Sequence, residues 1–149
     1  KLVYRASVDR FSEKAFYEAC GTNSPTLMII TSNYNKIFGG FTDRSWDGNG
    51  YKCSSSSWLF SLDEQEMYPI KPDSTHYAIG CYEGQDGPVF GVGCDLLISF
   101  DRSGHHCYSN LGVTYDAQKY ANDDEKRKSV LAGNHYFTVE EMEIFTVRF

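Results

Sequence analysis

The acidic pair Glu141 and Glu143 is the arrangement in this sequence best suited to acid–base chemistry. Residues two apart in a strand lie on the same face, so the two carboxylates are expected side by side. Neighbouring carboxylates raise each other's pKa, which suits a general acid or base. The alternative is an ion-paired strand end in which Arg5 or Arg148 neutralises the acids, and we prefer that interpretation.

Cys107 is the candidate nucleophile, because it follows His105 and His106 directly. A reactive thiolate needs a nearby cation or base. Adjacency along the chain does not direct a histidine at its neighbour's sulfur, however. The preferred interpretation is therefore a small buried cysteine beside exposed turn histidines.

Cys81, Cys94 and Cys107 are the candidate metal ligands, and they are evenly spread. Zinc sites usually supply ligands two to four residues apart, which this spacing does not offer. The Gly91-Val92-Gly93 segment lacks the third glycine and the following helix of a dinucleotide-binding loop. We therefore predict no metal and no cofactor. The two glycines instead suggest a bulge or a close approach of two backbones.

Five residues are the predicted contacts with a protein partner: Arg5, Trp46, Asp95, Glu141 and Glu143. Trp46 lies in a glycine-rich loop, where aromatic residues often bind partners, and the equal alternative is that it caps the core. Asp95 comes just before a short apolar run. An acid there must find a polar partner or lie at the mouth of the strand.

Composition excludes several classes of protein. The net charge of -6 argues against a broad nucleic-acid surface. No apolar run approaches the roughly 20 residues of a membrane helix. The five cysteines are odd in number, without a Cys-x-x-Cys pair or a glycosylation motif, which favours free thiols in a reducing, cytoplasmic compartment. The 149 residues predict one domain, residues 1–149, which we expect to be monomeric by itself. Because the chain starts at Lys1, we expect this domain to be taken from a longer protein.

The elements that position these residues are mostly short strands. Ser12 is expected to cap a helix that runs to Cys20. Apolar runs between turn residues predict strands at 26–31, 36–42, 57–62, 67–70, 76–82, 96–98 and 141–147. Pro69 marks an edge strand, whereas 141–147 is apolar on both faces and is placed inside a sheet. The charge run 123–128 is a short helix or a solvated loop.

This pattern predicts a mainly β fold with a few helices, namely an antiparallel sandwich of two sheets flanked by short helices. The order of its motifs resembles the TLDc domain over essentially the whole chain. The motifs that carry the resemblance are Tyr4-Arg5-Ala6-Ser7, Phe38-Gly39-Gly40-Phe41-Thr42, Trp58-Leu59-Phe60-Ser61-Leu62, Gly87-Pro88-Val89-Phe90-Gly91, Asp95-Leu96, Leu131-Ala132-Gly133 and 137–145.

The resemblance implies the same sandwich, together with a role in oxidative-stress resistance and endolysosomal function. Several members of that family bind the vacuolar proton-pumping ATPase and regulate its assembly. We therefore expect a protein-interaction domain whose partner is a peripheral subunit of this pump, acting in the cytoplasm and at endolysosomal membranes. The alternative is an oxidative-defence enzyme, either a peroxide-handling thiol protein or a hydrolase using Glu141 and Glu143.

Overall fold

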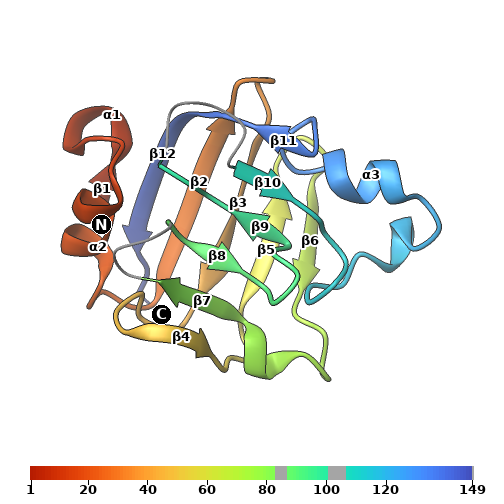
Figure 1. The fold of residues 1–149 in the computed structure, drawn as a ribbon, viewed down its shortest axis with the longest axis horizontal. Coiled ribbons are helices and arrows are strands. Elements are labelled where there is room, and N and C mark those ends of the chain that lie inside the picture. The colour runs from red at the N-terminus through yellow and green to blue at the C-terminus, as the bar shows by residue number, and fades with distance from the viewer. Residues whose placement is uncertain (83–86, 101–106, 149) are drawn as a thin grey trace.

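A computed structural model of the protein describes residues 1–82, 87–100 and 107–148. Within these residues the chain forms two antiparallel sheets of six strands each, and the sheets pack face to face (Figure 1). The predicted sandwich is confirmed. The core between the sheets is rich in aromatic side chains, which the 15% aromatic content favoured.

The first sheet holds the longest strands. Its order is β1 (Leu2–Arg5), β12 (Val139–Thr146), β2 (Thr26–Ser32), β3 (Ile37–Thr42), β5 (Trp58–Ser61) and β6 (Glu66–Pro69). The predicted hairpin is present as β2 and β3, which pair from Thr26 with Thr42 to Thr31 with Ile37. The placement of the last strand inside a sheet is confirmed, because β12 pairs with both β1 and β2. The predicted edge strand is β6.

The second sheet is built from shorter strands. Its order is β11 (Tyr136–Phe137), β10 (Cys107–Ser109), β9 (Leu96–Leu97), β8 (Val89–Phe90), β7 (Ile79–Tyr82) and β4 (Asn49–Lys52). The strand predicted at 76–82 begins later than expected. Its first residues belong to the 3-10 helix η1 (Thr75–Tyr77), and only the remainder pairs with neighbouring strands.

The helices lie at two ends of the sandwich. α1 (Ala6–Asp9) and α2 (Glu13–Cys20) are drawn beside β1, whereas α3 (Asp124–Ser129) lies at the opposite side (Figure 1). The predicted cap of α2 is confirmed, because the Ser12 hydroxyl accepts the Ala15 N–H at 3.1 Å. The charge run forms α3, preceded by the 3-10 helix η2 (Gln118–Tyr120), so the helical alternative was the right one.

The two faces of β12 have different surroundings. Met142 and Ile144 are fully buried in the core between the sheets. Glu141, Glu143 and Phe145 alternate with them and lie half-buried on the other face of the first sheet. The strand is therefore apolar on both faces as predicted, but the Phe145 ring faces away from the core.

Candidate functional site

The outer face of the first sheet brings together three of the five predicted partner contacts. Arg5 on β1 lies directly opposite Glu143 on β12. The Arg5 guanidinium donates to the Glu143 carboxylate from Nη2 at 2.7 Å and from Nε at 3.1 Å. Glu141, on the same face, accepts the Ser7 N–H at 3.1 Å and also the Ser7 hydroxyl. Of the two candidate cations, Arg5 is the one that pairs with Glu143.

These contacts shift the pKa values of Glu141 and Arg5. Burial raises the pKa of Glu141, but hydrogen bonds from Ser7 and from the Met142 N–H outweigh it and hold that pKa below its ordinary value. The hydrogen bond to Glu143 raises the pKa of Arg5. The ionised forms of Glu141 and Arg5 are therefore favoured, which suits a charged surface patch more than a general acid with a raised pKa.

An apolar stripe crosses the same face beside the acidic pair. The strand register places six side chains opposite one another across all six strands. In sheet order this outer stripe consists of Leu2, Phe145, Leu27, Phe41, Trp58 and Pro69. Residues directly opposite in neighbouring strands present their side chains to the same face. The outer stripe therefore spans the full width of the sheet.

A second row runs parallel to the outer stripe and changes in character along its length. In sheet order it consists of Arg5, Glu143, Ile29, Gly39, Phe60 and Met67. Its end at β1 is an ion pair, whereas its end at β6 is apolar. Together the two rows make a face with a charged corner and an apolar centre, which we call the outer face.

A groove of about 350 Å³ lies at the β6 end of the outer face. It is lined by side chains of both rows, including Leu27, Ile29, Trp58 and Phe60. At its rim Leu62 and Met67 are 58% and 59% exposed. Apolar side chains as exposed as these, gathered around one groove, are typical of an interaction surface.

The rim of this groove is held by a polar network around Glu66 of β6. The Glu66 carboxylate accepts hydrogen bonds from the Tyr120 hydroxyl at 2.6 Å, the Tyr68 hydroxyl at 3.0 Å and the Lys119 ammonium at 2.9 Å. Burial raises the pKa of Glu66, but these hydrogen bonds, led by the one from Tyr120, outweigh it and lower the pKa. These hydrogen bonds link η2 to β6 and stabilise the position of β6 at the edge of the groove.

Trp46 is placed in the core, so its prediction as a partner contact is corrected. The side chain is fully buried, and its ring packs edge-on against Phe16 and Phe90 at centroid distances of 5.8 and 5.4 Å. Its indole N–H donates to the Thr26 hydroxyl at 3.2 Å. The loop folds inward here because a tryptophan buries a large apolar area once its N–H finds an acceptor.

Asp95 is likewise buried, and its prediction as a partner contact is corrected as well. Its carboxylate accepts the backbone N–H groups of Gly112, Val113, Thr114 and Tyr115, all at 3.0 to 3.1 Å. Burial raises the pKa of Asp95, opposed by the hydrogen bonds from these backbone groups. The carboxylate therefore organises the 112–115 loop from inside the fold.

The prediction of a bulge or a close approach of two backbones at Gly91 and Gly93 is wrong, because the atoms nearest to a Cβ at either position belong to side chains. Gly91 has a φ of +88°, and a Cβ there would lie 2.4 Å from the Asp95 Oδ1. A Cβ on Gly93 would lie 2.6 Å from the Val113 side chain. Only glycine leaves room for Asp95 and the loop that it binds.

Comparison with protein-family models gives a match to the TLDc domain over residues 1–148. The match covers nearly the whole chain, in agreement with the motif order. This chain belongs to the TLDc domain family. A comparison with curated proteins finds no match. Membership links the chain in general terms to oxidative-stress resistance.

The cysteines of this TLDc domain are all free thiols. Burial raises the pKa of Cys20 to about 12, of Cys81 to about 11, and that of Cys107 above its ordinary value. The Cys107 Sγ contacts the backbone of Ser99 at 3.3 Å, which agrees with the interpretation as a small buried cysteine. His105 and His106 lie outside the described residues. A thiol with a raised pKa is a poor nucleophile.

Two further features concern metals and membranes. Among residues 1–82, 87–100 and 107–148, no three His, Cys, Asp or Glu side chains are grouped to hold a metal ion. In the same part of the chain, every helix is too short or too polar to cross a bilayer.

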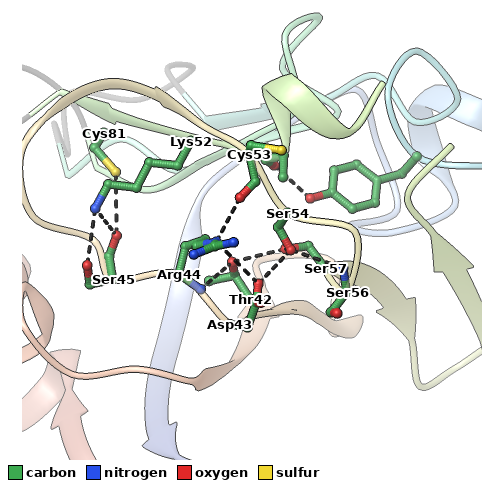
Figure 2. A network of polar contacts seen from close by, with 12 residues as sticks. Thr42, Asp43, Arg44, Ser45, Lys52, Cys53, Ser54, Ser56, Ser57 and Cys81 are labelled. Carbon is green, nitrogen blue, oxygen red and sulfur yellow. Dashed lines mark hydrogen bonds and ion pairs between the residues drawn. The ribbon is translucent and has the colours of Figure 1, made fainter. Parts of the chain in front are cut away.

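The serine run 54–57 forms hydrogen bonds that stabilise the segment between β3 and β5 (Figure 2). Ser54 and Ser57 are buried, and the Ser57 hydroxyl lies 3.0 Å from both the Ser54 and the Thr42 hydroxyls. The Ser54 hydroxyl donates to Asp43, while the Arg44 Nε donates to the Cys53 carbonyl at 2.7 Å. These contacts hold the connection from β3 to β5. The buried hydroxyls are shielded from substrate, so they do not form a nucleophilic site.

The outer stripe was missed at the level of the sequence. Its members come from six strands that are far apart along the chain. The local signal was present, since the strands at 26–31 and 141–147 each carry apolar residues at positions two apart on both faces, and Trp58, Phe60 and Leu62 share one face of the strand at 57–62. Only the register shows that these second faces align into one surface.

Proposed function

We propose that this TLDc domain is a protein-interaction module that docks, through its outer face, on a peripheral subunit of the vacuolar proton-pumping ATPase. The observation that carries the proposal is the outer stripe, an apolar row that spans the first sheet. Pro69 of this row is exposed, Phe41 is buried and the other four members are half-buried, and contiguous apolar side chains that solvent still reaches are typical of binding surfaces.

The composition of the outer face suits a protein partner. Trp58 and Phe60 supply the large aromatic side chains that anchor protein interfaces, and their rings pack at a centroid distance of 5.8 Å. The Phe41 ring stacks on the Trp58 ring at a centroid distance of 5.4 Å and restricts the movement of the Trp58 side chain. The ion pair of Arg5 with Glu143 forms a polar rim that orients a partner and contributes little to stability by itself.

The mechanism in this proposal is a shift of the assembly equilibrium of the pump. A module that binds the free peripheral subunit more tightly than the assembled pump favours disassembly, and the reverse preference favours assembly. A difference of about 1.4 kcal/mol between the two affinities shifts the equilibrium tenfold. The domain would act at the cytoplasmic face of endolysosomal membranes.

The experiment compares the binding of matched variants to the purified peripheral sector of the pump. Leu62→Glu and Met67→Glu each place a charge on an exposed rim residue of the groove. Val92→Glu is the control, because Val92 is also exposed, at 44%, but follows β8 in the second sheet. We expect at least about tenfold weaker binding for the two rim variants and unchanged binding for the control.

Two results would contradict the proposal. One is an absence of binding by the parent domain, and the other is binding that Leu62→Glu and Met67→Glu leave unchanged. Glu143→Gln separates the charged corner from the apolar centre, because it removes the charge and keeps the size. Melting temperatures of all variants confirm that a loss of binding reflects the surface and not the fold.

A further inference from the structure

A polar cavity of about 300 Å³ lies at the α3 end of the molecule. It is lined by residues from four segments: the residues after β6, the loop before η2, η2 with the residue that follows it, and α3. The polar side chains that line it are those of Lys71, Asp116, Gln118 and Arg127. None of these residues lines the groove on the outer face. The cavity is therefore a separate site, and inferences about it do not depend on the proposed docking function.

Two cations line this cavity, and one of them forms no direct ion pair. The Lys71 ammonium donates to the Gly112 carbonyl at 2.6 Å and forms no ion pair within the described part of the chain. The Arg127 guanidinium forms an ion pair with Asp124 through Nη2 and a long bond of 3.4 Å to the Leu111 carbonyl through Nη1. Lys71 is therefore available to pair with an anion, although the Asp116 carboxylate lines the same cavity.

The Arg127 Nε–H is the second unusual feature. It is buried and has no acceptor among the described residues. A buried donor without a partner is rare and destabilising. In a guanidinium, Nε and a neighbouring Nη form the fork that binds two oxygens of a phosphate or carboxylate. In Arg127 the nitrogen beside the Nε–H is Nη2, which pairs with Asp124, a side chain that is 74% exposed. A ligand in the cavity would displace this solvent-exposed partner and bind Nε and Nη2 together.

The loop that carries the cavity wall is already rigid. Asp95 accepts the N–H groups of Gly112 and Val113, which leaves the Gly112 carbonyl to orient Lys71. The opposite wall is acidic. Asp116 accepts the Gln118 N–H through Oδ1 at 2.9 Å, and its Oδ2 has no partner in the described residues. A free carboxylate oxygen of this kind suits a hydroxyl donor and repels a second anion.

From these features we infer that the cavity binds a small phosphomonoester whose organic part carries hydroxyl groups. The phosphate lies between Lys71 and Arg127, where it gives Lys71 an ion-pair partner and supplies the missing acceptor for the Arg127 Nε–H. The hydroxyl groups face Asp116 and the Gln118 amide. The cavity volume of about 300 Å³ admits a small ligand of this class.

The experiment is a titration of the ¹⁵N-labelled domain with glycerol 3-phosphate, followed by NMR at constant ionic strength. Inorganic phosphate and glycerol are titrated in parallel. We expect saturable shifts of the Gly112 and Gln118 amides, with glycerol 3-phosphate binding more tightly than inorganic phosphate and glycerol not binding. Lys71→Met removes the ammonium charge and keeps the aliphatic stem, so its affinity should fall about tenfold or more.

Lys119→Met is the matched control, because Lys119 lies beside Gln118 but pairs with Glu66 outside the cavity. It should leave the affinity unchanged. Shifts that do not saturate, or that Lys71→Met and Lys119→Met weaken equally, would mean non-specific attraction and would overturn the site. Equal affinities for inorganic phosphate and glycerol 3-phosphate would overturn the role of Asp116. Far-UV circular dichroism checks that both variants are folded.

Discussion

Replacement of Asp95 tests whether this buried acid holds the fold together. Asp95→Ala removes the carboxylate that accepts the N–H groups of four consecutive residues, 112–115. Asp95→Asn keeps the size but turns one carboxylate oxygen into an amide that donates. Three of the four N–H groups reach Oδ2 as their closest or only acceptor, so an amide in that position would oppose them.

The magnitude follows from the number of donors left without a partner. A buried N–H without an acceptor costs about 1–3 kcal/mol. If water enters the vacated space and satisfies two of the four, two remain, and the loss is about 2–6 kcal/mol. This is a large share of the roughly 5–15 kcal/mol that stabilises a domain. The asparagine variant should lose a similar amount.

Urea unfolding followed by tryptophan fluorescence, to which the buried Trp46 and the half-buried Trp58 contribute, measures this loss. The control is Asp63→Ala, because Asp63 also accepts a backbone N–H, that of Ile37 at 2.7 Å, but at an exposed site where water replaces it. We expect a change below about 1 kcal/mol for the control. An Asp95→Ala variant within about 1 kcal/mol of the parent would refute the structural role of Asp95.

Three further predictions concern the core, the groove rim and the thiols. Ile144→Ala should cost about 2–5 kcal/mol in urea unfolding and Phe145→Ala clearly less, because only Ile144 is fully buried; equal costs would reverse the assignment of the two faces. Tyr120→Phe removes a hydrogen bond that lowers the pKa of Glu66. The stabilisation that this bond gives the folded state is present above a pH of about 4.3 and is lost as the pH falls through the lowered pKa. The loss of unfolding free energy in the variant should therefore shrink on acidification, and a loss independent of pH would contradict this. A folded variant without cysteines should protect stressed cells nearly as well as the parent, and complete loss of protection would show that a thiol is required.

The strands and the capped helix were predictable because their signals are local. The apolar runs at 26–31 and 36–42, separated by turn residues, specify a hairpin without reference to the rest of the chain. Ser12 caps α2 through a residue only three positions away. The interior position of β12 followed from apolar residues on both of its faces.

The roles of Trp46 and Asp95 were not predictable because their partners are distant in the sequence. Trp46 packs against Phe16 and Phe90, which come from two separate elements. Asp95 binds a loop 17 to 20 residues further along. A tryptophan in a loop or an acid before a strand carries no local sign of such partners. The sequence therefore indicated that these residues matter and did not reveal that they are buried.

The outer face was not predictable for the same reason, because it forms only when strands that are distant in the sequence pair in a particular register. The ion pair of Arg5 and Glu143 was one of two pairings that the sequence allowed, and the register of β1 with β12 selects it. The groove beside it depends on the pairing of β2, β3, β5 and β6. A shift of one residue in any of these strands would turn its outward side chains into the core.

The central claim is that the outer face docks on the peripheral sector of the vacuolar proton pump, and the two tryptophans allow a direct test. Trp58 lies half-buried on the outer face, whereas Trp46 is fully buried in the core. Labelling both with 5-fluorotryptophan gives two ¹⁹F resonances, whose solvent exposure is measured by the isotope shift between H₂O and D₂O. On addition of the purified peripheral sector, we predict that the Trp58 resonance loses its isotope shift and that Trp46 keeps its small one. A complex in which Trp58 remains as exposed as in the free domain would contradict the account.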